Sequence, residues 1–139
     1  MQTQQEQNKQ AVRRFNLEVI EQGNRESFQE LMDPQFVNRS APPEAPNGPE
    51  SLFAFFNEVL RAGLPNLKVT IHDQLAEGDK VTTRKTIEGT HTGPLMGVPA
   101  SHKVIRIEVI DIVRLRDGRY LEHWGINTFP SVLAQLKQS

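Results

Sequence analysis

The chain has 139 residues, of which 37% are hydrophobic, carries a formal net charge of −1 and contains no cysteine. This length suits one domain with a core of its own, so we expect a single domain over residues 1–139. The lack of cysteine excludes disulfides and thiolate ligands, and the nearly balanced charge argues against a nucleic-acid partner.

The beginning of the chain gives no sign of export. Residues 1–10 are polar and lack the apolar segment of a secretory signal. No apolar run in the sequence approaches the ~20 residues that a membrane span needs. We therefore expect a cytoplasmic protein with no membrane partner.

The first part of the chain has the hydrophobic period of helices. Residues 5–22 predict an amphipathic helix, because four apolar residues recur on one face at spacings of three and four: Val12, Phe15, Val19 and Ile20. Asn24 is a suitable N-cap for a short second helix that runs through Met32. Asp33-Pro34 would end that helix, since proline disfavours helical backbone in the residue before it.

A loop and a third helix are expected next. Residues 36–38 read as a short extended piece, and residues 40–48 hold three prolines and a glycine, which indicates a loop. Pro49 fits the first position of a helix. The buried face of that helix would be formed by Leu52, Phe55, Phe56, Val59 and Leu60.

From Pro65 onward the hydrophobic period falls from about 3.6 to about 2 residues, which is typical of strands. Glycine-containing turns, Glu77–Lys80 and Asp117-Gly118, separate neighbouring strands as in hairpins. The expected strands begin near Leu67 and cover about 81–91, 103–115 and 119–128, and a short helix follows at 130–137.

Three helices followed by a four-stranded antiparallel meander predict an α+β fold with the helices on one face of the sheet. A long, bent sheet folded over a helix forms a cone with a closed end and an open mouth. Ligand pockets in such a fold lie inside the cone. Inward-facing polar residues on the strands are therefore the candidates for function.

Several motifs, in this order, resemble the SnoaL-like polyketide cyclases, also known as ester cyclases, of the nuclear transport factor 2-like superfamily. They are Glu88-Gly89-Thr90-His91-Thr92-Gly93, Met96-Gly97-Val98-Pro99, Ile110-Asp111-Ile112-Val113-Arg114, Asp117-Gly118-Arg119 and Glu122-His123-Trp124. The resemblance implies an α+β barrel or cone in which N-terminal helices pack in a curved antiparallel sheet. It also implies a cyclase without a cofactor, which closes a ring by intramolecular aldol condensation of a polyketide ester.

The sequence departs from the family at the positions that carry its chemistry. The resemblance implies an acid/base aspartate two residues after the histidine of the last strand, where this chain has Gly125. It implies a pocket histidine on the preceding strand, where this chain has Asp111. The resemblance also implies that related ester cyclases often carry a substitute aspartate a few residues further on. This chain has Thr128 at that position, so the substitute is absent as well.

Asp111 is the first candidate for a catalytic residue. It interrupts the apolar strand Val-Ile-Asp-Ile-Val, where both strand propensity and burial disfavour a carboxylate. The pattern Ile-Asp-x-x-Arg also resembles ketosteroid isomerases, in which a protonated aspartate donates a hydrogen bond to an oxyanion. We expect Asp111 to face the cavity as an acid with a raised pKa; the alternative is a buried structural carboxylate paired with Arg84 or a strand-end donor.

His123 is the second candidate for a catalytic residue. The alternation of the last strand places Leu121, His123 and Gly125 on one face, and the resemblance makes that face the pocket side. A histidine there could act as a general base near neutral pH. The alternative is a hydrogen-bonded core histidine.

Four further residues are candidates for contact with the ligand. Arg84 could hold an anionic group or pair with Asp111, or simply be solvated. His91 could reach the mouth of the cone or cap the backbone of its loop. Asn38 stands where ketosteroid isomerases carry their general-base aspartate, and an amide cannot take up a proton. Phe56 is the ring of the third helix most suited to line an apolar pocket.

The sequence predicts neither a metal site nor a cofactor. The histidines at positions 72, 91, 102 and 123 lack the spacing of metal ligands, and no phosphate loop or dinucleotide fingerprint is present.

Two other functions stay open besides the cyclase. One is a non-catalytic module that binds a small apolar molecule. The other is an isomerase or epoxide hydrolase of the same fold, the latter needing two aspartates bridged by an arginine.

The outer face of the sheet predicts a protein partner. Ile110, Ile112, Trp124 and Ile126 would point away from the helices, and together they form a larger apolar surface than a monomer usually leaves in water. We expect a homodimer that forms through this face.

Overall fold

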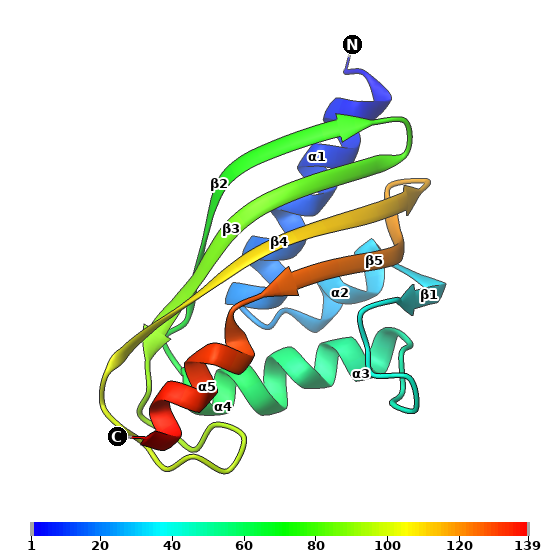
Figure 1. The fold of residues 1–139 in the computed structure, drawn as a ribbon. Helices are drawn as coiled ribbons and strands as arrows, with labels where there is room; N and C mark the ends of the chain where they lie inside the picture. The colour runs from blue at the N-terminus through cyan, green and yellow to red at the C-terminus, as the bar shows by residue number, and fades with distance from the viewer. Residues whose placement is uncertain (1, 139) are drawn as a thin grey trace.

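The computed structural model describes residues 2–138, which form helices packed against a curved sheet (Figure 1). The order of elements is the one expected for an α+β fold. The helical segments are α1 (Gln4–Arg14), η1 (Phe15–Glu21), α2 (Arg25–Leu31), α3 (Pro49–Ala54), η2 (Phe55–Leu60), α4 (Arg61–Gly63) and α5 (Phe129–Gln138). The strands are β1 (Met32–Asn38), β2 (Lys68–Glu77), β3 (Lys80–Thr90), β4 (Val104–Arg116) and β5 (Arg119–Asn127).

The sheet has five strands in the order β1-β5-β4-β3-β2. The expected meander of β2 to β5 is confirmed, and all its neighbouring strands are antiparallel. The expectation of four strands is wrong, because β1 adds to β5 as a parallel edge strand. The expected barrel is also wrong: β1 and β2 are the two edges of an open sheet, so the cone does not close.

The second helix ends earlier than the sequence predicts. Met32 begins β1 instead of ending α2, and its backbone is extended, with φ −112° and ψ 124°. Pro34 sits inside β1, which is tolerated because β1 is an edge strand with one unpaired side. The strand therefore covers Met32–Asn38.

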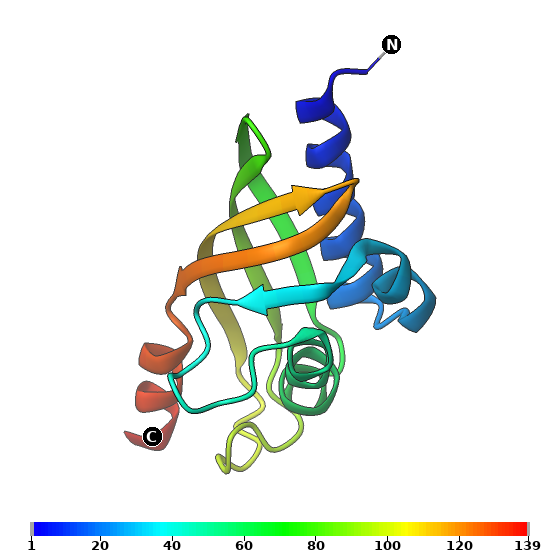
Figure 2. The same ribbon diagram turned by 90° about the vertical axis from the view of Figure 1, so that its right-hand side faces the viewer.

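The helices fill the concave side of the sheet. α1 packs against β2 and β3, α3 packs against β1, and α5 packs against β4. Figure 2 shows the sheet curling over these helices, with α1 and α5 at opposite ends of the curve. No helix among residues 2–138 combines the length and the apolar character needed to cross a bilayer.

Local signals in the sequence explain where the helices begin. The side chain of Asn24 caps α2 by accepting a hydrogen bond from the backbone of Ser27, as predicted. Pro49 occupies the first turn of α3, also as predicted. Both long helices then change to a π-helical segment, η1 after α1 and η2 after α3. Wider π-helical turns are common next to functional sites, and here both segments lie toward the interior of the cone.

A β-bulge changes the faces of β5. Arg114 pairs with Glu122 and Leu115 pairs with Tyr120, so Leu121 is an extra residue between them. The bulge lets Tyr120 point inward, where it is buried and its ring stacks on Phe15 at 4.2 Å. Beyond the bulge, the strand alternates as expected and His123 again faces the concave side.

Candidate functional site

The cone contains a cavity of about 350 Å³ between the concave face of the sheet, η2 and the start of α5. This volume is at the small end of the range typical for ligand sites, about 300–1,000 Å³. Most of its wall is apolar, and the polar groups gather on β3, β4, β5 and the end of β1. The apolar side chains of the wall include Leu52, Phe55, Phe56, Leu60, Ile87, Ile107, Val109 and Phe129.

Asp111 and Lys85 meet in the wall of this cavity. Both residues line it, both are buried, and Lys85 Nζ lies 3.3 Å from Asp111 Oδ2. The register explains the contact, because Thr83 is paired with Asp111, and Lys85 is two residues further along the same face of β3. The ammonium group therefore neutralises the carboxylate diagonally across the β3–β4 ladder.

Asn16 holds Lys85 from the helical side. Its side-chain amide donates to the carbonyl of Val12 at 2.8 Å, which fixes Oδ1 as the acceptor for Lys85 Nζ at 2.6 Å. Asn16 belongs to η1 and is itself buried. The lysine is thus fixed between two acceptors, Asn16 and Asp111, instead of reaching solvent.

His123 lies beside the same carboxylate. Its Nε2 is 3.4 Å from Asp111 Oδ2, and its Nδ1 is 2.9 Å from Asn38 Oδ1. Asn38 Oδ1 also accepts the backbone N–H of Ser40, so it must be the acceptor for His123 as well. Nδ1 of His123 therefore carries the hydrogen, and Nε2, which faces Asp111, is the nitrogen that can gain or lose a proton.

The electrostatics of the site correct the expected role of Asp111. Burial raises the pKa of this carboxyl group, but the charge of Lys85 and the contact with His123 lower it by more, so the pKa lies below its usual value. The expected acid with a raised pKa is therefore wrong, because the interior cation on β3 was not foreseen. Burial, and next to it the negative charge of Asp111, raise the pKa of Tyr120, which stays a neutral phenol.

Gly125 leaves room for the polar cluster because it has no side chain. It pairs directly with Asp111 across the β4–β5 ladder. A Cβ placed on Gly125 would lie 3.1 Å from Asp111 Cβ and 3.1 Å from His123 Cε1, which is tighter than ordinary packing. The carboxylate and the imidazole thus occupy space that a side chain at position 125 would take.

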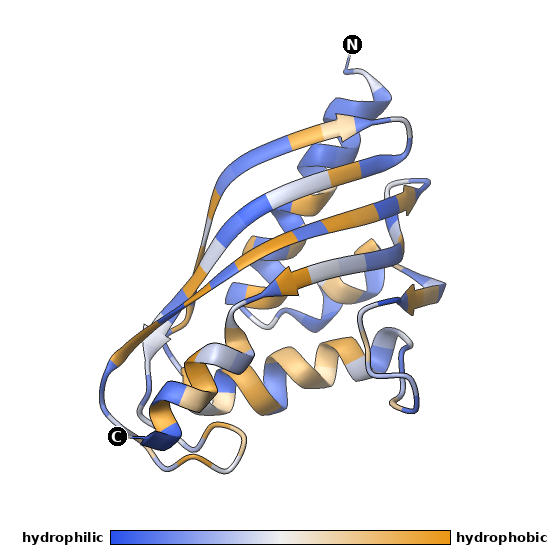
Figure 3. Cartoon of the chain, in the orientation of Figure 1, coloured by the Kyte–Doolittle hydropathy of each residue, from blue (hydrophilic) through white to orange (hydrophobic). Residues whose placement is uncertain are grey.

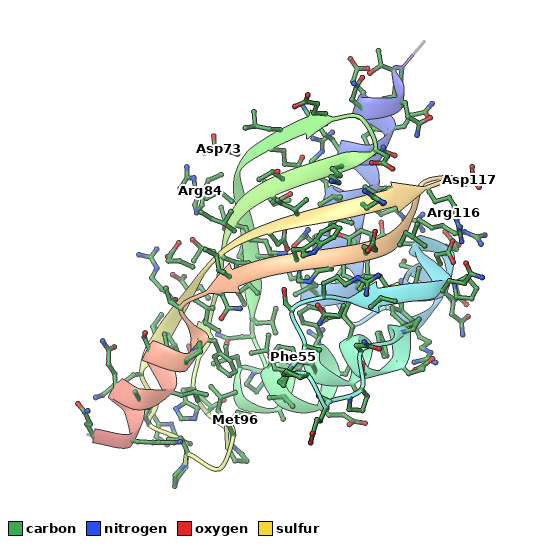
Figure 4. All side chains as sticks on the ribbon, turned by 45° about the vertical axis from the view of Figure 1, so that its right-hand side comes forward. Phe55, Asp73, Arg84, Met96, Arg116 and Asp117 are labelled. Atoms are coloured by element: carbon green, nitrogen blue, oxygen red, sulfur yellow. The ribbon has the colours of Figure 1, made fainter. Side chains whose placement is uncertain are left out.

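Arg84 lies outside the cavity, which corrects its expected roles as a ligand contact and as a partner of Asp111. It points to the outer face of β3 and pairs with Asp73, with Arg84 Nη2 2.7 Å from Asp73 Oδ2. Figure 4 shows these two side chains on the outer side of the sheet, away from Phe55. The reason is the alternation of β3: Arg84 is out of phase with the buried Val81 and Ile87.

His91 is also absent from the cavity wall. It is fully buried, and its Nδ1 lies 2.8 Å from the hydroxyl of Ser101 and accepts the backbone N–H of the same residue. It therefore caps the loop that joins β3 to β4, which was the alternative to a ligand contact. Asn38 and Phe56 do line the cavity, and Asn38 contacts the imidazole of His123.

Two polar residues of the site, Lys85 and Asn16, were not among the expected candidates. Lys85 could have been found from the strand alternation, because it is in phase with Val81 and Ile87. Asn16 could have been found from the helical spacing, because it lies four residues after Val12 and three before Val19, on the apolar face of the helix. Among residues 2–138 there is no group of histidines and carboxylates arranged to hold a metal ion.

A comparison with known proteins identifies the family to which the chain belongs. A family model for the SnoaL-like polyketide cyclases matches residues 10–136, which is most of the chain. The chain belongs to the SnoaL-like polyketide cyclase family. No curated protein sequence gives a significant match.

Solved structures of this family share the fold over nearly the whole chain. A protein from Jannaschia sp. CCS1, assigned as a SnoaL-like polyketide cyclase, has 28% identity and a TM-score of 0.85, with 100% of this chain and 97% of that chain covered. IdmH from Streptomyces antibioticus, assigned as a polyketide cyclase, has 29% identity and a TM-score of 0.80, with 94% and 99% covered.

The fold is also shared with a protein of different chemistry. An epoxide hydrolase from M. tuberculosis of the type abbreviated LEH has 13% identity and a TM-score of 0.72, with 98% of this chain and 93% of that chain covered. At this identity the likeness shows the fold alone. Epoxide hydrolysis was expected to need two aspartates bridged by an arginine. The site does not support it, because Arg84 pairs with Asp73 on the outer face and does not reach Asp111.

Proposed function

We propose that this protein is an enzyme without a cofactor that moves a proton at the carbon next to a carbonyl group of a small apolar compound, and that it closes a ring by this step as a cyclase. One observation carries the proposal: a histidine, a carboxylate and an ammonium group meet in the wall of an apolar cavity. Such chemistry needs a base near the carbon and a positive group near the oxygen.

His123 serves as the base in this proposal. Its Nδ1 hydrogen is held by Asn38, so Nε2, which lies beside Asp111 Oδ2, is the nitrogen that takes up the proton. When Nε2 takes up a proton, its contact with Asp111 Oδ2 becomes a charge-assisted hydrogen bond. Asp111 thus stabilises the imidazolium that forms during the reaction.

Lys85 supplies the positive group. As His123 takes the proton, the electron pair of the C–H bond becomes that of an enolate, and the ammonium group in the cavity wall favours the negative oxygen. The enolate carbon then attacks a second carbonyl of the same molecule and forms the new C–C bond. The proton returns from His123 to the resulting alkoxide, so the protein ends as it began.

The position of the carboxylate fits what the resemblance implies for this family. The family's aspartate would stand at position 125, where this chain has glycine. Asp111 is the direct cross-strand partner of Gly125, so this chain brings a carboxylate to the same part of the cavity from the neighbouring strand. The pairing of a carboxylate with a histidine is thereby retained although the family's own aspartate is missing.

The test is hydrogen–deuterium exchange at carbon 1 of 2-tetralone, followed by NMR in deuterated buffer with EDTA and no added cofactor. We expect the protein to accelerate the exchange and His123→Gln to lose at least about a hundredfold of that acceleration, the usual contribution of a general base. His72→Gln, an exposed histidine outside the cavity, is the matched control. Equal exchange by the wild type and His123→Gln would contradict the proposal and leave a binding module.

A further inference from the structure

Asn47 is the one asparagine in the sequence that is followed by a glycine. It lies in the loop of residues 39–48, which Figure 2 shows as the teal segment between the end of β1 and the start of α3. Asn47 is exposed, and its side-chain amide forms no hydrogen bond with residues 2–138. The amide is therefore open to solvent and not fixed in one orientation.

The side chains of the other asparagines are held in place. Each of them forms at least one hydrogen bond to the backbone or to another side chain, which fixes the orientation of its amide group. They are Asn8, Asn16, Asn24, Asn38, Asn57, Asn66 and Asn127. Among residues 2–138, Asn47 is thus the asparagine whose amide can turn toward the backbone that follows it.

The backbone of Gly48 is equally open. Its N–H group has no hydrogen-bond partner among residues 2–138, and its conformation is extended, with φ −90° and ψ −174°. A Cβ placed on Gly48 would meet no atom within 4 Å. Neither a hydrogen bond nor a neighbouring side chain therefore keeps the nitrogen of Gly48 away from Cγ of Asn47.

These two groups are the reactants of asparagine deamidation. Once hydroxide has removed the proton from the nitrogen of Gly48, the electron pair of this nitrogen forms a bond to Cγ of Asn47. The C–N bond of the side-chain amide breaks, and its nitrogen takes up a proton from water and leaves as ammonia. The resulting five-membered succinimide closes readily because both reacting groups belong to one chain. Water then opens the ring at either carbonyl carbon, which leaves aspartate or isoaspartate.

We propose that Asn47 is a site of spontaneous deamidation in the folded protein, and that its products alter the loop of residues 39–48 at the cavity. The inference goes beyond the proposed function and does not depend on it. The loop contributes Ala41, Pro42 and Pro46 to the cavity wall, so a change in its course changes the shape of that wall.

The backbone carbonyl of Asn47 closes this loop onto β1. It accepts the N–H of Asn38 at 2.7 Å, and Asn38 Oδ1 is in turn the acceptor for His123 Nδ1. Both products add a negative charge beside this contact. In isoaspartate the chain also reaches Gly48 through the former side chain, which lengthens the loop by one CH₂ group and leaves the former carbonyl as a free carboxylate. The modification therefore acts on the residue that orients the imidazole.

The experiment follows the purified protein during incubation at mildly alkaline pH by peptide mass spectrometry. We expect the peptide with position 47 to gain an OH group in place of NH₂ and to separate into two chromatographic peaks, for aspartate and isoaspartate. Asn66, whose Oδ1 accepts the backbone N–H of Thr90 and which is followed by leucine, is the control within the same sample. Equal deamidation of the two asparagines would overturn the inference.

Gly48→Ala is the matched variant, because the fold has room for the added methyl group while that group crowds the attacking nitrogen. We expect it to slow the reaction at least about tenfold, which corresponds to ~1.4 kcal/mol of activation free energy. Deamidation of Gly48→Ala at the rate of the wild type would overturn the inference.

The same measurement in urea tests whether the fold leaves this site open. We expect the native protein to react within about tenfold of the unfolded chain, a difference of at most ~1.4 kcal/mol in activation free energy. A larger reduction in the native protein would mean that the fold protects Asn47, and it would overturn the inference.

The effect on the loop is measured by NMR of the deamidated protein, which ion exchange separates by its additional negative charge. We expect the backbone amide signal of Asn38 to shift and that of Asn66 to stay in place. An unchanged Asn38 signal would overturn the proposed change in the loop. None of these measurements uses 2-tetralone, so failure of the proposed function would leave their results intact.

Discussion

Asp111 and Gly125 face each other across the β4–β5 ladder, so close that a Cβ on Gly125 would lie 3.1 Å from the Cβ of Asp111. The same Cβ would lie 3.2 Å from Nε2 of His123. This glycine is needed for space and not for an unusual backbone, since it is not among the residues with positive φ. The contact between carboxylate and imidazole depends on it.

Gly125→Ala should therefore impair the site more than the fold. We expect the exchange of 2-tetralone to fall about tenfold to a hundredfold, because displacements of about 1 Å misalign reacting groups. The cost in stability should stay within about 1–3 kcal/mol, as for other overpacked sites. The measurements are the exchange rate and urea denaturation, with Gly48→Ala, where an added Cβ would meet nothing within 4 Å, as control. Full activity in Gly125→Ala would show that the imidazole and carboxylate do not need this space.

Lys85 should be essential for stability as long as Asp111 is present. Removing one partner of a buried ion pair leaves an uncompensated charge, so Lys85→Met should lower the free energy of unfolding by about 3–5 kcal/mol. Replacing both partners, as in Lys85→Met with Asp111→Leu, should recover most of this loss, since apolar side chains pack well at such positions. Urea denaturation of the two proteins measures the difference. A double variant no more stable than the single one would mean that the ion pair is not the source of the effect.

The sequence predicted the general fold because its signals are periodic. The helix and strand periods, the N-cap Asn24 and the first-turn Pro49 all have local physical causes, and the structure contains them. The fifth strand was missed since a single parallel edge strand with a proline lacks alternation. Whether a sheet closes depends on pairing between distant strands, which no local pattern reports.

The site was only partly predictable for the same reason. Alternation together with the family resemblance predicted that His123 lies on the pocket side, Asp111 was predicted to face the cavity from its place in an apolar strand, and both line the cavity. The same alternation favours Lys85 over Arg84 for the inner face of β3, because Lys85 is in phase with Val81 and Ile87. The direction of the pKa shift of Asp111 depends on the distance to Lys85 across two strands, so it required the three-dimensional structure.

Asp33 should make stability depend on pH at the acid end. A backbone hydrogen bond from Gln35 lowers the pKa of this carboxyl group, and so does the ion pair with Arg116, although burial opposes both. A carboxyl group with a lowered pKa stabilises the fold above its unfolded pKa of about 3.9, and this contribution is lost as the pH falls through the folded value. Figure 4 shows Arg116 next to the β4–β5 turn, where this contact lies.

We therefore expect Asp33→Asn to be less stable than the wild type at neutral pH and to lose less stability between about pH 5 and pH 2. Urea denaturation at several pH values measures this, and Glu44→Gln, in an exposed loop, is the control. Parallel pH profiles for Asp33→Asn and the wild type would contradict the prediction.

Asn38 should act on the reaction by positioning His123. Asn38→Ala removes the acceptor that holds the Nδ1 hydrogen, so the imidazole could take the other tautomer, and we expect a reduced rate of 2-tetralone exchange. Asn38→Asp keeps the acceptor and adds a negative charge, which favours the protonated imidazole. The pH at which exchange reaches half its maximum should therefore rise in Asn38→Asp. An unshifted pH profile in that variant would argue for a purely structural role of Asn38.

The outer face of the sheet should form a homodimer. Ile110, Ile112 and Ile126 are 46%, 36% and 74% exposed on β4 and β5, on the side away from the helices. Trp124 lies on the same side, and Lys80 Nζ lies 5.7 Å from its ring centroid. Figure 3 shows the hydrophobic segments of β4 interrupted by polar ones. Exposed apolar surface of this kind is stabilised when a second copy covers it.

Light scattering at micromolar concentration should therefore give the mass of a dimer. Ile126→Glu should shift the protein to a monomer, because the interface would have to bury an unpaired charge. Leu17→Glu, at a residue 48% exposed on the helical segment η1, should leave the dimer intact, since it does not belong to the sheet. A wild-type monomer would contradict the prediction, and so would a dimer that Ile126→Glu leaves unchanged. In the second case the copies would associate through another surface, such as the edge strand β2 with its unpaired backbone groups.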